Sequence, residues 1–144
     1  MEKSNSFLYS FFGLIIFQFF MSLEEILGHF QEYLALLTGK VHKVISFFPV
    51  INLNDQFFLF INLLVFIIFI FIGILVFLNF RWSKILAVIL GCIEIINGGL
   101  HILASLYFMQ YIPGSISAVG LIIFGLLVIF IRPSVQQGAT EEKI

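Results

Sequence analysis

The chain carries little charge, and this shortage decides the class of protein. Only 10% of its 144 residues are charged, whereas 61% are hydrophobic, a composition that a soluble domain of this size could not bury. The formal net charge is −1 and no long basic run is present, so nothing indicates a nucleic-acid partner. A single cysteine, Cys92, excludes a disulfide framework. We therefore expect an integral membrane protein.

Long hydrophobic runs are abundant. Four of them, 7–27, 57–79, 84–108 and 115–131, fall in the range of roughly 17–25 residues with which a helix crosses a bilayer. They predict an all-α fold, a four-helix transmembrane bundle that forms one domain over residues 1–144. The links at 81–84 and 110–114 are short, so the last three spans should be neighbours. Close helix packing is expected at the small residues Gly91, Gly98, Gly99 and Gly120.

The basic residues predict the orientation of these spans. With four spans, both chain ends and the link at 81–84 share one side, which would carry Lys3, Arg81, Lys84, Arg132 and Lys143. The other side would carry only Lys40 and Lys43. The positive-inside rule then predicts a multi-pass protein of the cell membrane with both termini in the cytoplasm.

The connection between the first two spans is patterned as an amphipathic helix over about residues 28–46. Apolar residues recur at spacings of three and four, at Ile26, Leu27, Phe30, Tyr33, Leu34, Leu37, Val41, Val44 and Ile45. Polar residues fill the other side, at Gln31, Glu32, Lys40, His42 and Lys43. The helix, with a break expected at Gly39, should be an interfacial anchor, and a lid over the bundle mouth is the alternative.

Two rows of polar side chains interrupt the apolar spans. Glu94, Asn97 and His101 lie three and four residues apart and therefore share one face of the third span. The end of the first span carries a second row, which consists of Gln18, Ser22, Glu25, His29 and Glu32, with Glu24 beside it. An ionisable group at membrane depth costs at least about 2.5 kcal/mol, so both rows should face a partner or a cavity instead of lipid.

The heights of the two rows predict that they meet. At about 1.5 Å per residue, Glu24 and Glu25 lie within one helical turn of the height of His101, and Gln18 lies level with Asn97. A poorly solvated carboxylate beside an imidazole can hold or pass a proton. We therefore expect Glu24, Glu25, His101 and Glu94 as catalytic residues, with substrate bound by Asn97, His29 and Gln18.

Two other interpretations of these residues exist. Glu25, His29, Glu94 and His101 offer nitrogen and oxygen ligands, but their spacing matches no compact metal motif, so we predict no metal, and no cofactor is indicated. In the purely structural interpretation the polar residues join helices by hydrogen bonds of about 0.6 kcal/mol each. That interpretation is favoured for Asn97 alone, and the functional one for the acids and histidines as a group.

Several short segments resemble the HXXEE-motif family of small bacterial membrane proteins. They are Met21 to Glu25, then Asn97 and His101, then Tyr111 to Gly114 with 115–119 after it. The resemblance implies that Glu24, Glu25, Asn97, His101 and the turn at Tyr111 are characteristic positions, and it adds Tyr111 to the substrate-binding residues. It implies no particular activity. One position departs from the motif, because the leading histidine of the family is Met21 here, and His29 is a candidate to replace it.

Three functions fit these observations. In the leading hypothesis, the protein lies among membrane lipids and uses an intramembrane Glu/His/Asn pocket to bind a hydrophobic or amphiphilic small molecule, and acid–base transformation of that molecule would make it an enzyme. The first alternative is a small proton-coupled exporter that acts as a homo-oligomer, with Glu94 as its proton carrier. The second is a non-catalytic membrane accessory subunit whose polar rows bind a partner helix.

Overall fold

The computed structural model describes residues 2–131, which form five helices and no strand. In chain order the helices are α1 (Glu2–Leu27), α2 (Phe30–Val44), α3 (Asp55–Phe77), α4 (Arg81–Phe108) and α5 (Ser115–Phe130). Three helical stretches are long and apolar enough to cross a membrane, namely Asn5–Leu27, α3 and α4, and α5 is a shorter apolar helix. The all-α fold is confirmed, and the predicted helices are present with ends shifted by a few residues. Residues 132–144, which include the predicted basic positions Arg132 and Lys143, lie outside the described residues.

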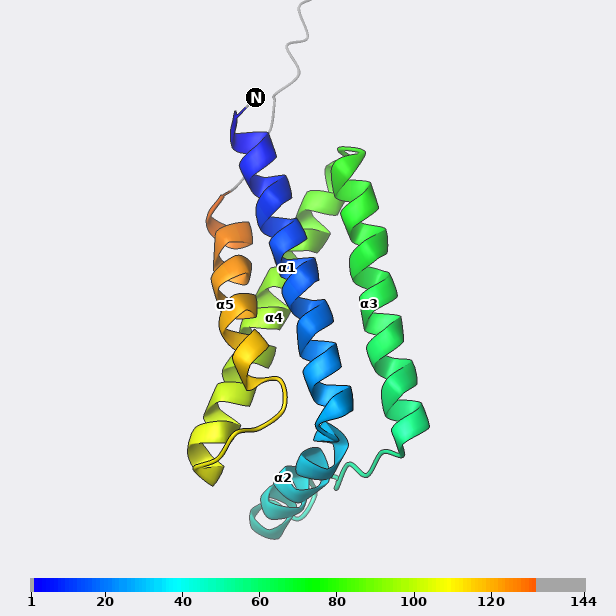
Figure 1. The fold of residues 1–144 in the computed structure, drawn as a ribbon, viewed down its shortest axis with the longest axis vertical. Coiled ribbons are helices and arrows are strands. Elements are labelled where there is room, and N and C mark those ends of the chain that lie inside the picture. The colour runs from blue at the N-terminus through cyan, green and yellow to red at the C-terminus, as the bar shows by residue number, and fades with distance from the viewer. Residues whose placement is uncertain (1, 132–144) are drawn as a thin grey trace, which may run out of the picture.

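The helices form an antiparallel arrangement (Figure 1). α1 and α4 run in one direction and α3 and α5 in the other, so the start of α1, the α3–α4 link and the end of α5 lie at one end of the bundle. α5 packs extensively against α4 and α1, and α1 also packs against α3, whereas α3 and α4 touch less. The apolar core lies between α1 and its neighbours and includes Phe7, Phe11, Leu14, Leu121 and Val128.

The link between α3 and α4 is shorter than predicted, because α4 begins at Arg81 instead of Lys84. Asn79 adopts a left-handed conformation (φ 59°), and the Phe80 N–H donates to the Leu75 carbonyl, which ends α3 in a Schellman-type turn. Ser83 then donates to the Phe80 carbonyl at 2.6 Å. Because of these local bonds the next helix starts directly after Phe80. Residues 81–84, which were expected to form the link, are therefore the first turn of α4.

Small residues join α4 to α5. A Cβ atom added to Gly98 would lie 2.9 Å from the Ala118 carbonyl oxygen, and one added to Gly125 would lie 2.9 Å from the Gly91 carbonyl oxygen. The expected close packing at Gly91, Gly98 and Gly120 is confirmed, with Phe17 covering Gly120. The same prediction is wrong for Gly99, because no atom would lie within 4 Å of its Cβ. Adjacent residues on a helix point about 100° apart, so only one of the two glycines can face α5.

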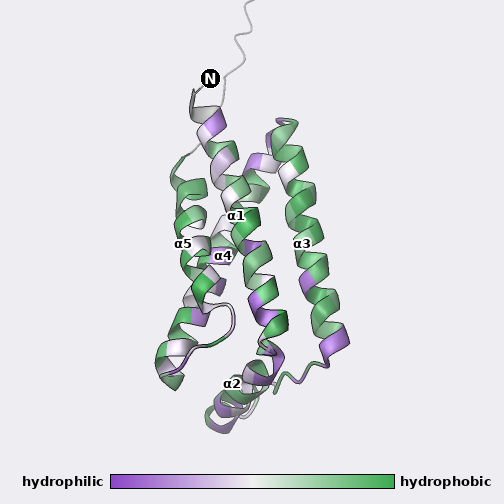
Figure 2. Ribbon diagram, in the orientation of Figure 1, coloured by the Kyte–Doolittle hydropathy of each residue, from purple (hydrophilic) through white to green (hydrophobic). Residues whose placement is uncertain are grey.

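α2 crosses the end of the bundle opposite to the N-terminus (Figure 1). It carries much of the hydrophilic surface, whereas α3 and α5 are mostly hydrophobic (Figure 2). The helix continues through Gly39, so the predicted break is wrong. At one end Gln31 donates to Asp55 Oδ1 at 2.6 Å, and farther along Lys40 lies over the ring of Phe108 at 4.4 Å. α2 therefore connects the start of α3 to the end of α4.

The orientation of α2 differs from the predicted amphipathic arrangement. Gln31, expected on the outer polar side, is buried, as is Thr38, which accepts the backbone N–H of Ile51. Val44, expected on the inner apolar side, is 85% exposed. The reason is that α2 packs on the polar start of α3 and on the loop before it, so the inward positions need hydrogen-bonding side chains.

Candidate functional site

The two polar rows meet at one pair of residues, while His29 and Glu32 of the first row are exposed. Glu25 on α1 and His101 on α4 form an ion-pair contact, with 3.0 Å between Oε1 and Nε2. Both side chains are buried, and the ring of Phe30 from α2 stacks on the imidazole with 4.4 Å between the ring centroids. Three helices therefore fix this pair, and α2 shields it at the end of the bundle.

The other nitrogen of His101 determines how protons are arranged in the pair. Nδ1 lies 2.9 Å from the carbonyl oxygen of Pro113. A carbonyl only accepts hydrogen bonds, so Nδ1 must carry a hydrogen. Nε2 and Glu25 Oε1 then share one proton, which gives either an imidazolium beside a carboxylate or a neutral imidazole beside a carboxylic acid. Either form can pass that proton to a third group.

The turn after α4 is shaped to meet the imidazole. Gly114 has a φ of 94°, and a Cβ at this position would lie 2.6 Å from His101 Nδ1. Only glycine adopts this backbone conformation without strain, and only glycine leaves the space that the ring occupies. The Pro113-Gly114 pair, expected as a plain turn, therefore also positions the imidazole.

Glu24, adjacent to Glu25, has a different environment. Its carboxylate accepts the backbone N–H of Gly114 at 3.0 Å and that of Ser117 at 3.2 Å, which are donors at the start of α5. It also accepts the Ser117 hydroxyl at 2.6 Å and the Tyr111 hydroxyl at 3.1 Å. A carboxylate at a helix N-terminus pairs with unsatisfied N–H groups and with the positive end of the helix dipole. Glu24 thus attaches α1 to the start of α5.

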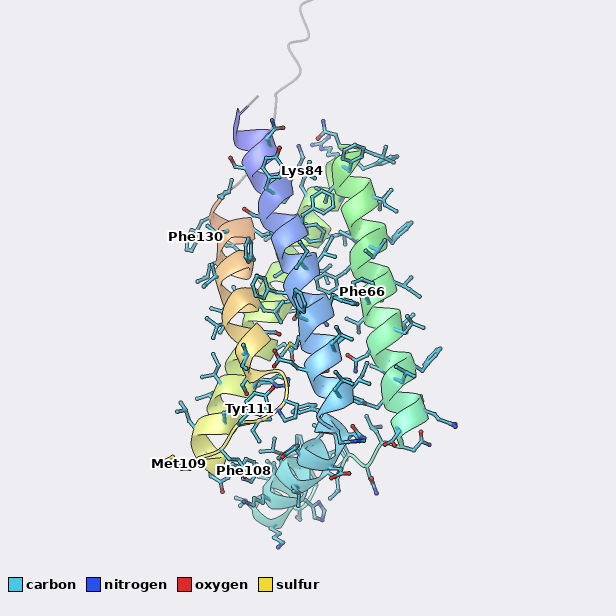
Figure 3. All side chains as sticks on the ribbon, viewed as in Figure 1. Phe66, Lys84, Phe108, Met109, Tyr111 and Phe130 are labelled. Atoms are coloured by element: carbon cyan, nitrogen blue, oxygen red, sulfur yellow. The ribbon has the colours of Figure 1, made fainter. Side chains whose placement is uncertain are left out.

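Tyr111 lies on the loop that leaves α4, beside α1 (Figure 3). It is 54% exposed, and its hydroxyl donates to Glu24. Desolvation, and then the hydrogen bond to Glu24 and the negative charge of that carboxylate, raise the pKa of Tyr111 above its ordinary value. The residue serves the same attachment as Glu24.

Glu94 forms a second buried group about two turns before His101, on the same face of α4. It is 3% exposed and accepts a hydrogen bond from Asn97 Nδ2 at 3.2 Å. The same amide nitrogen lies 3.5 Å from the sulfur of Met21, which is fully buried on α1. Met21 therefore packs inside this group.

A cavity of about 370 Å³ lies between α1, α3 and α4. Its polar wall comes mainly from α1 and α4 and consists of Gln18, Glu25, Glu94 and Asn97. The remaining wall is Asn62 together with apolar side chains, among them Phe30, Ile61, Val65, Ile68, Phe69, Leu90 and Ile93. Ile68 and Ile93 are 42% and 50% exposed, so the cavity reaches the outer surface of the bundle beside two apolar residues.

The predicted site residues thus divide into two groups. Gln18, Glu25, Glu94 and Asn97 line the cavity, and His101 lies directly behind Glu25. Glu24 and Tyr111 lie outside it, at the start of α5.

His29 also lies outside this cavity. It is exposed at the start of α2 in a left-handed conformation (φ 53°), and it lines a separate cavity of about 250 Å³. It is therefore not among the residues that line the larger cavity.

Sequence reasoning missed two residues of the site. Asn62 is the only amide or charged side chain between Phe57 and Phe77 and lies in the cavity wall, so its isolation in an apolar span was a usable signal. Phe30 gave no such signal, since aromatic residues are common throughout the chain and its stacking on His101 depends on the path of α2. Among the side chains that the structure describes, those of residues 5–131, no cluster of three or more His, Cys, Asp or Glu is arranged to hold a metal ion.

Comparison of the chain with protein-family models, with curated proteins and with solved structures found no match.

Proposed function

We propose that the protein binds the polar end of an amphiphilic small molecule in the cavity between α1, α3 and α4, and that the Glu25–His101 pair exchanges a proton there. The observation that carries this proposal is the composition of the cavity wall. Buried polar groups gather on α1 and α4, whereas the side toward α3 is largely apolar and opens beside Ile68 and Ile93. Pockets of this kind, mostly apolar with a few convergent polar groups, are typical of small-molecule sites.

The proposal includes a four-span topology in the cell membrane, with α1, α3, α4 and α5 as the spans and α2 at the outer surface. α5 has 16 residues, which is close to the shortest length that spans a bilayer. The start of α1, the α3–α4 link and the end of α5 lie at one end of the bundle, and that end carries Arg81 and Lys84. By the positive-inside rule this end is cytoplasmic.

Labelling tests this topology. In a Cys92→Ala background, Lys43→Cys should react with a membrane-impermeant maleimide in intact cells, and Lys84→Cys should react only after permeabilisation. The reverse pattern would overturn the orientation, and equal labelling of both in intact cells would overturn the topology.

The proton on the Glu25–His101 pair is what gives the cavity its chemistry. Glu25 lines the cavity and His101 lies behind it, held by the Pro113 carbonyl. Glu25 is therefore placed to accept or give a proton at the bound molecule, while His101 changes its protonation state to compensate. Asn97 and Gln18 would orient the polar end of that molecule.

The position of the acids supports this function over the two alternatives. A proton-coupled exporter with its key acid between subunits needs that acid on an outer surface, but Glu94 is 3% exposed within one chain. An accessory subunit that binds a helix through the polar rows needs those rows on the outer wall, whereas Glu25 and His101 contact each other inside the bundle. On the resemblance described above, we also propose a relation to the HXXEE-motif family, with Met21 in place of its histidine.

The test is whether the purified protein retains a lipid-like molecule in this cavity. Ile68 and Ile67 are adjacent on α3 and both exposed, but only Ile68 lines the cavity. Mass spectrometry of extracts should find a retained molecule in the wild type and in Ile67→Trp, and much less of it in Ile68→Trp. Equal retention by both variants would overturn the proposed site.

A further inference from the structure

The cavity has a buried hydrogen-bond acceptor without a donor. Gln18 is 4% exposed, and its Nε2 donates to the Ser22 hydroxyl, while its Oε1 is buried with no hydrogen-bond partner. Leaving a buried carbonyl unpaired is costly, and native structures contain few such atoms. Gln18 lines the cavity, so a small rotation of its side chain would let this atom accept a hydrogen bond from a bound molecule.

The cavity also has a buried acid without a cation. The three acids near the site differ in how their charge is compensated: Glu24 has the donors at the start of α5, and Glu25 has His101. Glu94 has the hydrogen bond from Asn97, and in the described part of the chain no Lys, Arg or His forms an ion pair with it. A buried carboxyl group is stable only when it is paired or protonated, so a cation placed beside Glu94 would favour its charged form.

The amide nitrogens of Asn97 and Asn62, the remaining amides of the wall, already donate to groups of the protein. Asn97 Nδ2 donates toward Glu94 and Met21, and Asn62 Nδ2 donates to the Phe58 carbonyl at 3.3 Å. What the wall offers to a ligand is therefore mainly oxygen acceptors, among them the Glu94 carboxyl group. A ligand whose polar end is a carboxylate or phosphate would place acceptor against acceptor and add like charge.

We infer that the ligand of this cavity is an amphiphilic amine, with a positively charged, hydrogen-bond-donating head against Gln18 and Glu94 and an alkyl chain along α3. This inference rests on the proposed function and specifies its ligand class. An ammonium group has three donors and no acceptor, which matches the groups left open in the wall. The apolar side chains, among them Val65, Ile68 and Leu90, then cover the chain. A volume of about 370 Å³ lies within the range of small-molecule sites, roughly 300–1,000 Å³.

The experiment compares three amphiphiles with the same chain and different heads. Purified full-length protein in a nonionic detergent is incubated with radiolabelled dodecylamine in a scintillation proximity assay, and unlabelled dodecylamine, dodecanol and dodecanoate compete. Dodecylamine should bind saturably, and dodecanoate should require at least about tenfold higher concentrations to compete, the size expected for one charge-assisted hydrogen bond.

Matched variants connect the result to the site. Glu94→Gln keeps the shape of the side chain and removes its charge, so it should weaken dodecylamine binding by about tenfold or more. Glu32→Gln removes the same charge from the exposed face of α2 and should change binding by less than about twofold. Gln18→Leu is a second variant that removes the unpaired acceptor without altering charge, and it should also weaken the amine.

The outcomes separate this inference from the proposed function. If dodecanol or dodecanoate binds at least as tightly as dodecylamine, and binding is lost in Ile68→Trp but not in Ile67→Trp, the cavity holds an amphiphile and the amine assignment is wrong. The same holds if Glu94→Gln and Gln18→Leu both bind dodecylamine like the wild type. If no head group gives binding that distinguishes Ile68→Trp from Ile67→Trp, the proposed function itself fails.

Discussion

Two regions of the bundle use polar residues differently. We call the close contact between α4 and α5 the seam, and the space between α3 and α4 that holds the cavity the wedge. In the seam, helices approach closely through Gly98 and Gly125, and α1 contributes Glu24, whose carboxylate has four hydrogen-bond donors. In the wedge, helices stay apart around a cavity, and Glu94 and Gln18 are incompletely paired.

The adjacent acids Glu24 and Glu25 belong one to each of these regions. They differ by about 100° around α1, and that rotation directs one acid to the start of α5 and the other to His101 and the cavity. Complete pairing makes a polar group structural, whereas incomplete pairing leaves it available to a ligand.

The largest effect should come from breaking the attachment of α1 to α5. Glu24→Ala removes the acceptor for four donors, so the free energy of unfolding in detergent should fall by about 3 kcal/mol, the upper range for hydrogen bonds to a charged group. Glu32→Ala, on an exposed face of α2, should change it by less than about 0.5 kcal/mol. Similar values for the two variants would show that Glu24 is not structural.

The packing difference is tested at two neighbouring glycines. Gly99→Ala should stabilise the protein by about 0.5–1 kcal/mol, because alanine favours the helix and nothing lies near its Cβ. Gly98→Ala should destabilise it by about 1–3 kcal/mol, since the new methyl group would press on the Ala118 carbonyl. Unfolding measured by denaturant titration should separate the pair by about 2 kcal/mol, and equal stabilities would contradict the close α4–α5 contact.

In the wedge, an unpaired group should lower stability. Gln18→Leu should raise the free energy of unfolding of the ligand-free protein by about 1 kcal/mol, because it removes a buried acceptor that has no donor. The same variant should bind dodecylamine less well. A loss of stability in Gln18→Leu would indicate that the amide is a structural group like Glu24.

The smallest effect should be a pH dependence at Tyr111. Its pKa is raised in the folded protein, mainly by desolvation and then by Glu24, so folding favours the protonated phenol. The resulting stability is fully present below the ordinary value of 10.0 and is lost as the pH rises through the higher folded value. Thermal unfolding followed into this range should show a loss in the wild type that is smaller in Tyr111→Phe. Identical profiles would mean that the Tyr111–Glu24 bond does not contribute.

Much of the molecule follows from sequence periodicity alone. Runs of apolar residues predicted the helices, because length and composition determine which segments can be apolar helices at all. The spacing of Glu94, Asn97 and His101 placed them on one face. Counting residues along two helices placed Glu24 and Glu25 at the height of His101, and Glu25 is the one that contacts it. Such inferences succeed because helix geometry is regular, and helices that start at the same end of a bundle share a common scale of height.

Only the tertiary structure decided the roles of these groups. Whether Glu24 or Glu25 meets His101 depends on the rotation of α1 and on the path of the turn that contains Gly114, and neither is encoded in the spacing of the acids. The inward direction of Gln31 follows from α2 packing on the start of α3. The unpaired Gln18 oxygen and the uncompensated Glu94 exist because α3 and α4 diverge around a cavity, and packing between distant segments is not a property of any one stretch of sequence.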